Sequence, residues 1–258
     1  MSGTLRVERG EDGVTTLWID NPSHRNALND GIIAALIAAL EAAGEDAGCR
    51  VVMLRGTEGI FCAGRELNDV RALQAAGTEA AEAAYRTLLR LNEALYYCRR
   101  PTVAVLERYA LGAGAALASW ADLALAEAGC KIGYPEVLVG LPPSQTTVSL
   151  IRNVPRKVAM DLLLTARNVE AEEAQRMGLV SRVVPAVALE EAVAAITAQL
   201  LRASPDAIAR TKRMIWKVED SDYRAAMTGA ADTITVAVTG REAREGIAAF
   251  VEKRKPAW

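Results

Sequence analysis

The fold is decided by residues 101–126, which read PTVAVLERYALGAGAALASWADLALA. Thr102 to Leu106 form a short apolar run, which predicts a buried strand. Gly112 to Gly114 form a glycine turn, and a helix of small residues is predicted after it over 115–121. A second strand-like run follows at 123–126. A strand, a helix and a further strand in this order favour an α/β fold with parallel strand pairing.

The same alternation continues on both sides of this stretch. Thr15 to Ile19 mix β-branched and aromatic residues and end at a turn-rich segment, which is typical of a strand. An apolar repeat at helical spacing runs from Ile32 to Leu40, and Asn29 or Asp30 can cap its start. The remaining predicted elements are strands at 51–54 and 179–184 and a long helix over 78–98.

Beyond Pro185 the sequence shows little strand signal and four amphipathic segments. Helices are predicted there over 189–201, 206–218, 223–239 and 242–253. We therefore expect two regions, a core formed by residues 1–200 and a helical C-terminal region formed by residues 201–258.

Composition excludes several classes of protein. The chain has 258 residues, of which 51% are hydrophobic and 24% charged, so it can bury a sizeable core and is not largely disordered. With 30 Lys and Arg against 32 Asp and Glu, its net charge of -2 provides no basic field for nucleic acid or an anionic membrane. We expect neither kind of partner.

Cysteine and histidine usage narrows the chemistry. Cys49, Cys62, Cys98 and Cys130 are scattered, which argues against a zinc site or a disulfide framework and fits a reducing compartment. The amino terminus carries charge early and lacks the apolar stretch of a secretory signal, so the cytoplasm is the expected location. His24 is the single histidine and lies in a polar turn, so we expect it to be exposed and carboxylates to be the acid/base groups.

Two glycine turns and one acidic segment are candidate sites. The turn at Gly112 to Gly114 fits a dinucleotide fingerprint poorly, because Leu117 occupies the sixth position. Its small residues allow close packing of a helix on a sheet, and the amino terminus of that helix can hold an anionic oxygen. The other turn, at 61–67, taken alone is an ordinary connection between a strand and a helix. Glu136 lies among apolar and rigid residues, so we expect it to be partly buried with a raised pKa.

These segments together resemble the crotonase family, also called the enoyl-CoA hydratase/isomerase family, over nearly the whole chain. Four pieces resemble its amino-terminal signature, its two oxyanion segments and the acidic segment that follows them; they are Asn21 to Asn29, Phe61 to Gly64, Tyr109 to Gly114, and Pro135 to Pro143. The resemblance implies an α/β fold built as a crotonase-like spiral of ββα units. It assigns acyl-CoA binding and catalysis to residues 1–200 and oligomerisation to residues 201–258.

The resemblance also implies roles for individual residues. The family stabilises an enolate next to a thioester carbonyl, and the two oxyanion donors fall on the backbone N–H groups of Arg65 and Ala113. Ala113 stands where the family most often has glycine, but alanine keeps the N–H. Glu136 falls on the position of an acid/base glutamate. The substrate and CoA path is expected along Arg25, Ala27, Ala63, Gly64 and Gly112, with Phe250 and Lys253 from the C-terminal region at the adenine and phosphate end.

One departure from the family pattern decides the expected reaction. The family's hydratases place two glutamates around a water molecule, and Ala116 occupies the position of the first one. A methyl group neither orients water nor transfers a proton. We therefore expect Glu136 to act alone and favour double-bond isomerisation. Hydration by one glutamate, and a catalytically silent relative that binds acyl-CoA, are the alternatives.

Further polar residues around these motifs have two interpretations each. Glu66 and Asp69 could replace the missing acid, but acids at a helix start more often cap it or complement its dipole. Ser144 either contacts substrate or shapes its turn, and the Arg65 guanidinium either reaches an anionic group of the substrate or is exposed to solvent. Tyr134 and Trp120 are expected to be packing residues. No metal or redox cofactor is expected, coenzyme A enters as part of the substrate, and the family's usual assembly is a homotrimer or a homohexamer.

Overall fold

The computed structural model describes residues 3–258 and contains a main sheet of 6 strands in the order β1-β2-β3-β4-β6-β9. The strands are β1 (Thr4–Arg9), β2 (Val14–Asp20), β3 (Val51–Gly56), β4 (Thr102–Leu106), β6 (Leu123–Glu127) and β9 (Arg182–Val184). β1 pairs antiparallel with β2, and all other neighbours in this sheet are parallel. The predicted α/β class with parallel pairing is confirmed.

A second, smaller sheet lies beside the main one and carries part of the site. It has 3 strands, β5 (Tyr109–Leu111), β7 (Lys131–Gly133) and β8 (Val169–Glu170). β5 pairs parallel with β7, and β7 pairs antiparallel with β8. Because β5 comes directly after β4 and directly before a glycine turn, this sheet places the turn next to the end of the main sheet.

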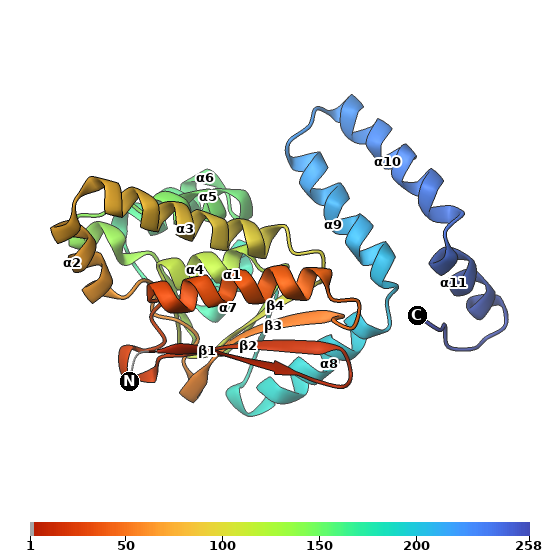
Figure 1. Cartoon of the computed structure of the whole chain (residues 1–258), viewed down its shortest axis with the longest axis horizontal. Coiled ribbons are helices and arrows are strands. Elements are labelled where there is room, and N and C mark those ends of the chain that lie inside the picture. The colour runs from red at the N-terminus through yellow and green to blue at the C-terminus, as the bar shows by residue number, and fades with distance from the viewer. Residues whose placement is uncertain (1–2) are drawn as a thin grey trace.

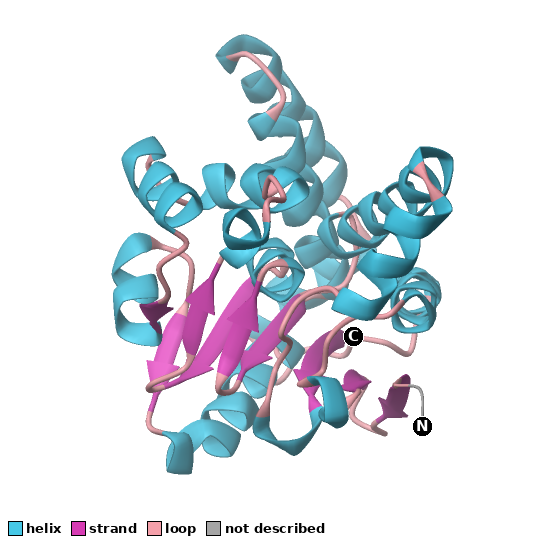
Figure 2. Cartoon of the chain, turned by 90° about the vertical axis from the view of Figure 1, so that its left-hand side faces the viewer, coloured by secondary structure: helices cyan, strands magenta, loops and turns pink. Residues whose placement is uncertain are grey.

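Helices cover both faces of the main sheet (Figure 2). The helices of the core region are α1 (Asp30–Glu45), α2 (Leu67–Ala76), α3 (Thr78–Tyr96), α4 (Ala113–Trp120), α5 (Ser144–Asn153), α6 (Arg156–Thr165), α7 (Ala171–Met177) and α8 (Leu189–Leu201). Val52 and Leu54 of β3 pack into the core shared with α1, whereas Val51 and Met53 pack into the core shared with α8. β3 and β4 are therefore buried along their whole length, which explains the apolar runs Val51 to Leu54 and Val103 to Leu106.

The capping of α1 follows the prediction. The side-chain oxygen of Asn29 accepts a hydrogen bond of 2.8 Å from the backbone N–H of Ile32, so Asn29, not Asp30, is the N-cap. The apolar repeat of this helix is buried against the sheet, as its helical spacing indicated.

The C-terminal arm, which we define as residues 205–258, extends away from the core (Figure 1). It consists of α9 (Pro205–Glu219), α10 (Tyr223–Val238) and α11 (Arg241–Val251). The Lys212 ammonium fastens α9 to the core, because it donates to the Asp122 carboxylate and to the carbonyl of Arg100. The expected boundary between residues 200 and 201 falls at the last residue of α8, shortly before α9 begins. The division into two regions stays a prediction.

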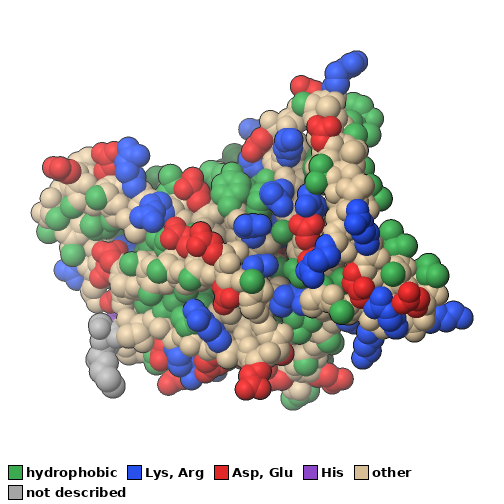
Figure 3. Space-filling view, turned by 45° about the vertical axis from the view of Figure 1, so that its right-hand side comes forward, with side chains coloured by type: hydrophobic (Ala, Val, Ile, Leu, Met, Phe, Trp, Pro, Cys, Tyr) green, Lys and Arg blue, Asp and Glu red, His purple; other side chains and the backbone are tan. Residues whose placement is uncertain are grey.

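Apolar side chains gather on the surface of the arm (Figure 3). Met227, Ile234, Val236 and Val238 of α10 are each more than half exposed, and Phe250 at the end of α11 is 86% exposed. Such a concentration of exposed apolar side chains is typical of a surface that another chain covers.

One predicted strand was too long. Only Arg182 to Val184 of the expected 179–184 strand pair with β6. α7 ends at Gly178 in a left-handed conformation, and the N–H of Leu179 bonds back to the carbonyl of Ala174 at 2.9 Å. Leu179 and Val180 are buried as part of this helix ending, so their apolar character comes from the core and not from a strand.

None of the helices formed by residues 3–258 combines the length and the apolar character that crossing a membrane requires. The cysteines are buried and unpaired within the same residues.

Candidate active site

A cavity of about 500 Å³ lies between α2, α3 and the two glycine turns. It brings together six residues that the sequence singled out as site residues, namely Ala63, Gly64, Arg65, Gly112, Ala113 and Glu136. Ser144 also lines it, which leaves open whether it contacts substrate or shapes its turn.

The two glycine turns are held together by backbone pairing. The N–H of Cys62 donates to the carbonyl of Tyr109 at 3.0 Å, and the N–H of Leu111 donates to the carbonyl of Cys62 at 3.0 Å. Gly64 has a φ of +99°, and a Cβ added to it would lie 2.9 Å from the Leu111 carbonyl oxygen and 3.5 Å from the Ala113 nitrogen. The first turn therefore lies directly against the start of α4.

Each turn presents one backbone N–H without an internal partner. Leu28 forms backbone hydrogen bonds with the residues on either side of Arg65: its N–H donates to the carbonyl of Gly64, and its carbonyl accepts from the N–H of Glu66. Among the described residues, no hydrogen bond uses the N–H of Arg65 itself. Ala113 is the first residue of α4, where the N–H has no partner within the helix. Two such N–H groups on adjoining turns can bind one oxygen that carries negative charge.

Glycine is required where α4 meets the first turn. A Cβ added to Gly114 would lie 2.4 Å from the carbonyl oxygen of Cys62, closer than two such atoms can approach. Gly112 has a φ of +52°, and a Cβ there would lie 3.2 Å from Oε1 of Glu136. The glycines thus allow the second turn to approach both the first turn and the acid.

Glu136 projects into this cavity from a short helix at Pro135–Val139. Its Oε1 accepts a hydrogen bond of 3.4 Å from the hydroxyl of Thr146, while its Oε2 is buried without a hydrogen-bond partner among the described residues. Burial raises the pKa of the Glu136 carboxyl above the ordinary value of 4.5, as the sequence predicted. An acid with one fixed oxygen and one unpartnered oxygen is suited to taking up and returning a proton.

The position of the expected first glutamate contributes no polar group. Ala116 is 2% exposed within α4 and is not among the residues that line the cavity. Of the residues that line the cavity, Glu136 is the acidic one.

The remainder of the cavity wall is mostly apolar. Leu67 and Val70 of α2, Leu88 of α3, and Leu138 and Val139 beside Glu136 contribute to it. Its polar exceptions include the side chain of Gln145, which donates to the carbonyl of Tyr85 at 2.9 Å and accepts from the side chain of Asn92 at 2.7 Å. No local pattern in the sequence indicated Thr146 or Gln145, because their hydrogen-bond partners lie on other elements.

The guanidinium of Arg65 is neither exposed nor free. It donates to the carboxylate of Asp30 at 2.9 Å and to the carbonyl of Leu28 at 3.4 Å, and its side chain is 11% exposed. The interpretation as a solvent-exposed arginine was therefore wrong.

The acids near the first turn have structural partners. Asp69 accepts from the N–H of Asp30 at 3.2 Å at the start of α1, and Glu66 accepts from the side chain of Asn21 at 3.4 Å. The side chain of His24 is 45% exposed, as predicted, and lies 3.6 Å from Glu66. None of these groups lines the cavity.

The remaining predicted site residues lie outside the cavity. Arg25 is exposed, and its carbonyl accepts from the N–H of Ala63 at 3.1 Å; Ala27 is buried two residues further along the chain. Phe250 and Lys253 lie at and just after the end of α11, which is on the opposite side of the molecule from α2 (Figure 1). Their expected contact with coenzyme A stays a prediction, and it requires a second copy of the chain.

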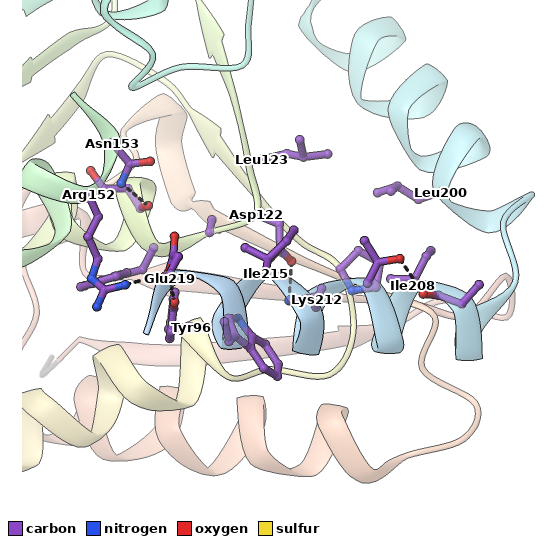
Figure 4. Close-up of a pocket in the computed structure, with 17 residues that line it drawn as sticks. Tyr96, Asp122, Leu123, Arg152, Asn153, Leu200, Ile208, Lys212, Ile215 and Glu219 are labelled. Atoms are coloured by element: carbon purple, nitrogen blue, oxygen red, sulfur yellow. Dashed lines mark hydrogen bonds and ion pairs between the residues drawn. The ribbon is translucent and has the colours of Figure 1, made fainter. Parts of the chain in front are cut away.

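A second cavity of about 440 Å³ lies between the core and α9 (Figure 4). Its two acids are already paired, Asp122 with Lys212, and Glu219 with Arg152 and Tyr96. The candidate acid/base site is therefore the first cavity, around Glu136.

The chain resembles known proteins over nearly its whole length. The family model described as enoyl-CoA hydratase/isomerase matches residues 9–258. The chain is 31% identical to a 2,3-dehydroadipyl-CoA hydratase of Escherichia coli, covering 94% of each chain. Among solved structures, an enoyl-CoA hydratase of Mycobacterium smegmatis superposes on this chain with a TM-score of 0.94 at 33% sequence identity. AtuE of Pseudomonas aeruginosa superposes with a TM-score of 0.94 at 36% sequence identity. Each match covers 98% of both chains. The fold is thus the crotonase fold, as expected, and the chain belongs to the enoyl-CoA hydratase/isomerase family, which acts on acyl-CoA thioesters.

Proposed function

We propose that this enzyme moves a double bond along the acyl chain of an enoyl-CoA and that Glu136 is its single acid/base group. The observation that carries the proposal is that Glu136, a partly buried acid whose Oε2 has no hydrogen-bond partner in the described part of the chain, lines the same cavity as Arg65 and Ala113, the residues with the two free N–H groups. Ala116 supplies no second acid, so a reaction that needs one carboxyl group agrees best with the site.

The proposed reaction conserves all atoms of the substrate. In a 3-enoyl thioester, the carboxylate of Glu136 takes a proton from C2, and the electron pair of that C–H bond spreads over a dienolate. The N–H groups of Arg65 and Ala113 hold the negative charge on the thioester oxygen. Glu136 then returns the proton to C4, which leaves the double bond between C2 and C3 and regenerates the carboxylate.

The environment of Glu136 supports both halves of this cycle. Burial raises the pKa of its carboxyl, which makes the carboxylate a stronger base than an exposed glutamate. The same shift leaves the protonated form stable long enough to act as the acid in the second step.

Hydration by Glu136 alone is the second candidate function. It is favoured by the names of the relatives, which include an Escherichia coli 2,3-dehydroadipyl-CoA hydratase and a Mycobacterium smegmatis enoyl-CoA hydratase. In this reaction Glu136 would activate water for attack on C3 of a 2-enoyl-CoA and then protonate C2.

Mass spectrometry in heavy water separates the two reactions. The purified enzyme is incubated with a 3-enoyl-CoA and, separately, with a 2-enoyl-CoA. Deuterium uptake without a gain of water, together with formation of the 2-enoyl isomer, supports isomerisation. A product heavier by one water molecule identifies a hydratase. Failure to convert either substrate contradicts both and leaves the catalytically silent acyl-CoA binder.

The variant Glu136→Gln tests the assigned residue. Glutamine keeps the shape of the side chain but cannot take a proton, so kcat should fall by roughly 10²- to 10⁴-fold while acyl-CoA binding persists. Glu66→Gln is the matched control, because this neighbouring acid lies outside the cavity. Unchanged turnover of Glu136→Gln would remove Glu136 from the mechanism.

The assembly and the cellular setting complete the proposal. The exposed apolar side chains of α10 and α11 support a homotrimer or a homohexamer formed through the arm. The cytoplasmic location and a reaction without metal or redox cofactor stay predictions from the sequence.

A further inference from the structure

We propose that the side chains of Asn92 and Gln145 fix the first turn of α5 against α3 and thereby position the acid Glu136. We call Asn92, Gln145 and the backbone carbonyl of Tyr85 the amide clasp. The inference rests on the proposed function, because it takes Glu136 as the acid/base group of the reaction. It goes further by assigning positioning roles to two residues that exchange no proton.

The hydrogen bonds of the amide clasp fix the orientation of both side-chain amides. The amino group of Gln145 donates to the carbonyl of Tyr85 at 2.9 Å, and the side-chain oxygen of Gln145 accepts from the amino group of Asn92 at 2.7 Å. Because a backbone carbonyl can only accept, the amino group of Gln145 must face Tyr85, which leaves the oxygen for Asn92. Tyr85 and Asn92 are two helical turns apart, so they lie on one face of α3.

Asn92 is a polar residue on an otherwise apolar helix face. It is buried on α3 together with Leu88, Leu91 and Leu95. A buried amide is costly unless it is hydrogen-bonded, whereas a leucine at this position would carry no such cost. A polar residue within an apolar helix contact can fix the register of that contact. The burial of Asn92 therefore agrees with a role in aligning α3 with α5.

The first turn of α5 depends on the amide clasp for its position. The helix begins at Ser144 after Pro143, and no side chain of residues 3–258 caps its start. Among the described residues, the hydrogen bonds of Gln145 are the ones that join α5 to α3. The next residue, Thr146, is buried, and its hydroxyl lies 3.4 Å from Oε1 of Glu136. This distance is long for a hydrogen bond between oxygens, so a small shift of the turn would break the contact.

The amide clasp carries no charge, so it can act on Glu136 only through geometry. Burial raises the pKa of the Glu136 carboxyl, and the hydroxyl of Thr146 acts against that rise. The other ionisable groups near the carboxyl are Arg65 and Tyr85 in the cavity wall, and Tyr134 two residues before it. Burial raises the pKa of Tyr134 to about 12, so its hydroxyl stays neutral. Loss of the clasp should therefore weaken the Thr146 contact and raise the pKa of Glu136.

The variant Asn92→Leu tests the amide clasp, because leucine has a similar size and Asn92 is not among the residues that line the cavity. Carbon-13 NMR of the carboxyl groups in the whole, ligand-free enzyme measures the pKa of Glu136, and the spectrum of Glu136→Gln assigns its signal. We expect Asn92→Leu to raise this pKa, to move the acidic limb of kcat/KM to higher pH and to lower kcat about 10-fold or more. In the Thr146→Val background, the same change should not shift the pKa further.

Two further variants keep the test independent of folding. Asn92→Leu combined with Gln145→Met replaces both amides with apolar side chains of similar shape, so the urea midpoint should stay that of the wild type while the pKa of Glu136 still rises. Asn153→Leu is the matched control. Asn153 is the last residue of α5, its side chain donates to the carbonyl of Ser119 at 3.2 Å, and it does not line this cavity. This control should leave the pKa of Glu136 unchanged.

The outcomes separate the amide clasp from the proposed reaction. Because the pKa is measured without turnover, a raised pKa in an enzyme that isomerises no enoyl-CoA would leave the clasp standing and overturn the reaction. An unmoved or lowered pKa in the folded Asn92→Leu enzyme would overturn the clasp, whatever the turnover. The clasp is also overturned if Asn92→Leu shifts the pKa equally with and without Thr146, or if Asn153→Leu shifts it by the same amount.

Discussion

The two oxygens of Glu136 are unequal, and this inequality makes Thr146 a positioning residue. The Thr146 hydroxyl lies 3.4 Å from Oε1 and stabilises the charged carboxylate, which lowers the pKa against the larger effect of burial. The same contact leaves Oε2 as the oxygen without a hydrogen-bond partner among the described residues.

Removal of this hydroxyl should change the pH dependence of the enzyme. Glu136 must be ionised to take the first proton, so kcat/KM rises with pH as the carboxyl loses its proton. Thr146→Val removes a contact that lowers the pKa of Glu136, and the acidic limb of kcat/KM should therefore move to higher pH. Thr146→Ser should restore it. Thr147→Val is the control, because the Thr147 hydroxyl bonds to the carbonyl of Pro143. An unmoved acidic limb in Thr146→Val would show that Thr146 does not act on the acid.

At the residue scale, the sequence predicted the residues that belong to motifs and missed those that belong only to the folded surface. Glu136 was predicted to be partly buried because its neighbours in the chain are apolar and rigid. Thr146 and Gln145 follow it by ten and nine positions and reach the cavity from α5. Their partners lie on other elements, so no local spacing could have identified them.

At the scale of elements, the contact between α4 and the first glycine turn controls the two N–H groups. A Cβ at position 114 would lie 2.4 Å from the Cys62 carbonyl oxygen, so Gly114→Ala should push α4 away from the turn. We expect kcat to fall by roughly 10²- to 10³-fold, comparable to the loss of one oxyanion donor, and stability to fall by about 1–3 kcal/mol.

Kinetics and urea unfolding of Gly114→Ala check this prediction. Gly44→Ala serves as the matched control, because Gly44 lies within α1 and a Cβ there would have as its nearest neighbour the Arg99 nitrogen at 3.9 Å. Full activity in Gly114→Ala would mean that the spacing of the two turns is unimportant for the reaction.

Elements with a strong local pattern were predicted well from the sequence. β3 and β4 are buried on both faces and each contains a run of four apolar residues, and α1 has both a cap and a helical repeat. The short strands β5, β7 and β8 have at most 3 residues each, too few to establish a periodicity. Their pairing depends on the arrangement of the whole core, which a local reading of the sequence does not contain.

At the scale of the whole molecule, the arm should join copies of the chain. α10 packs on α9 and α11 and leaves Ile234 63% exposed. Ile234→Asp should weaken assembly, because it places a charge on a surface that becomes buried, and we expect the subunit dissociation constant to rise by roughly 10-fold or more.

Light scattering after size exclusion measures the mass of the assembly. Val187→Asp is the control, because Val187 is 99% exposed on the core and not on the arm. The prediction fails if Ile234→Asp and the wild type show the same mass at every dilution, or if the wild type is monomeric.

The thiol of Cys62 lies inside the turn that supplies one of the two N–H groups, 3.4 Å from the backbone nitrogen of Gly64. The side chain is 0% exposed, and burial raises the pKa of the thiol to about 12. A thiol reagent in solution therefore reacts with Cys62 only when the turn opens and releases it. The rate of that reaction therefore measures how often this turn of the active site opens, and the measurement needs no added label. Bound substrate, by holding the turn closed, would lower the rate at which the Cys62 thiol is modified.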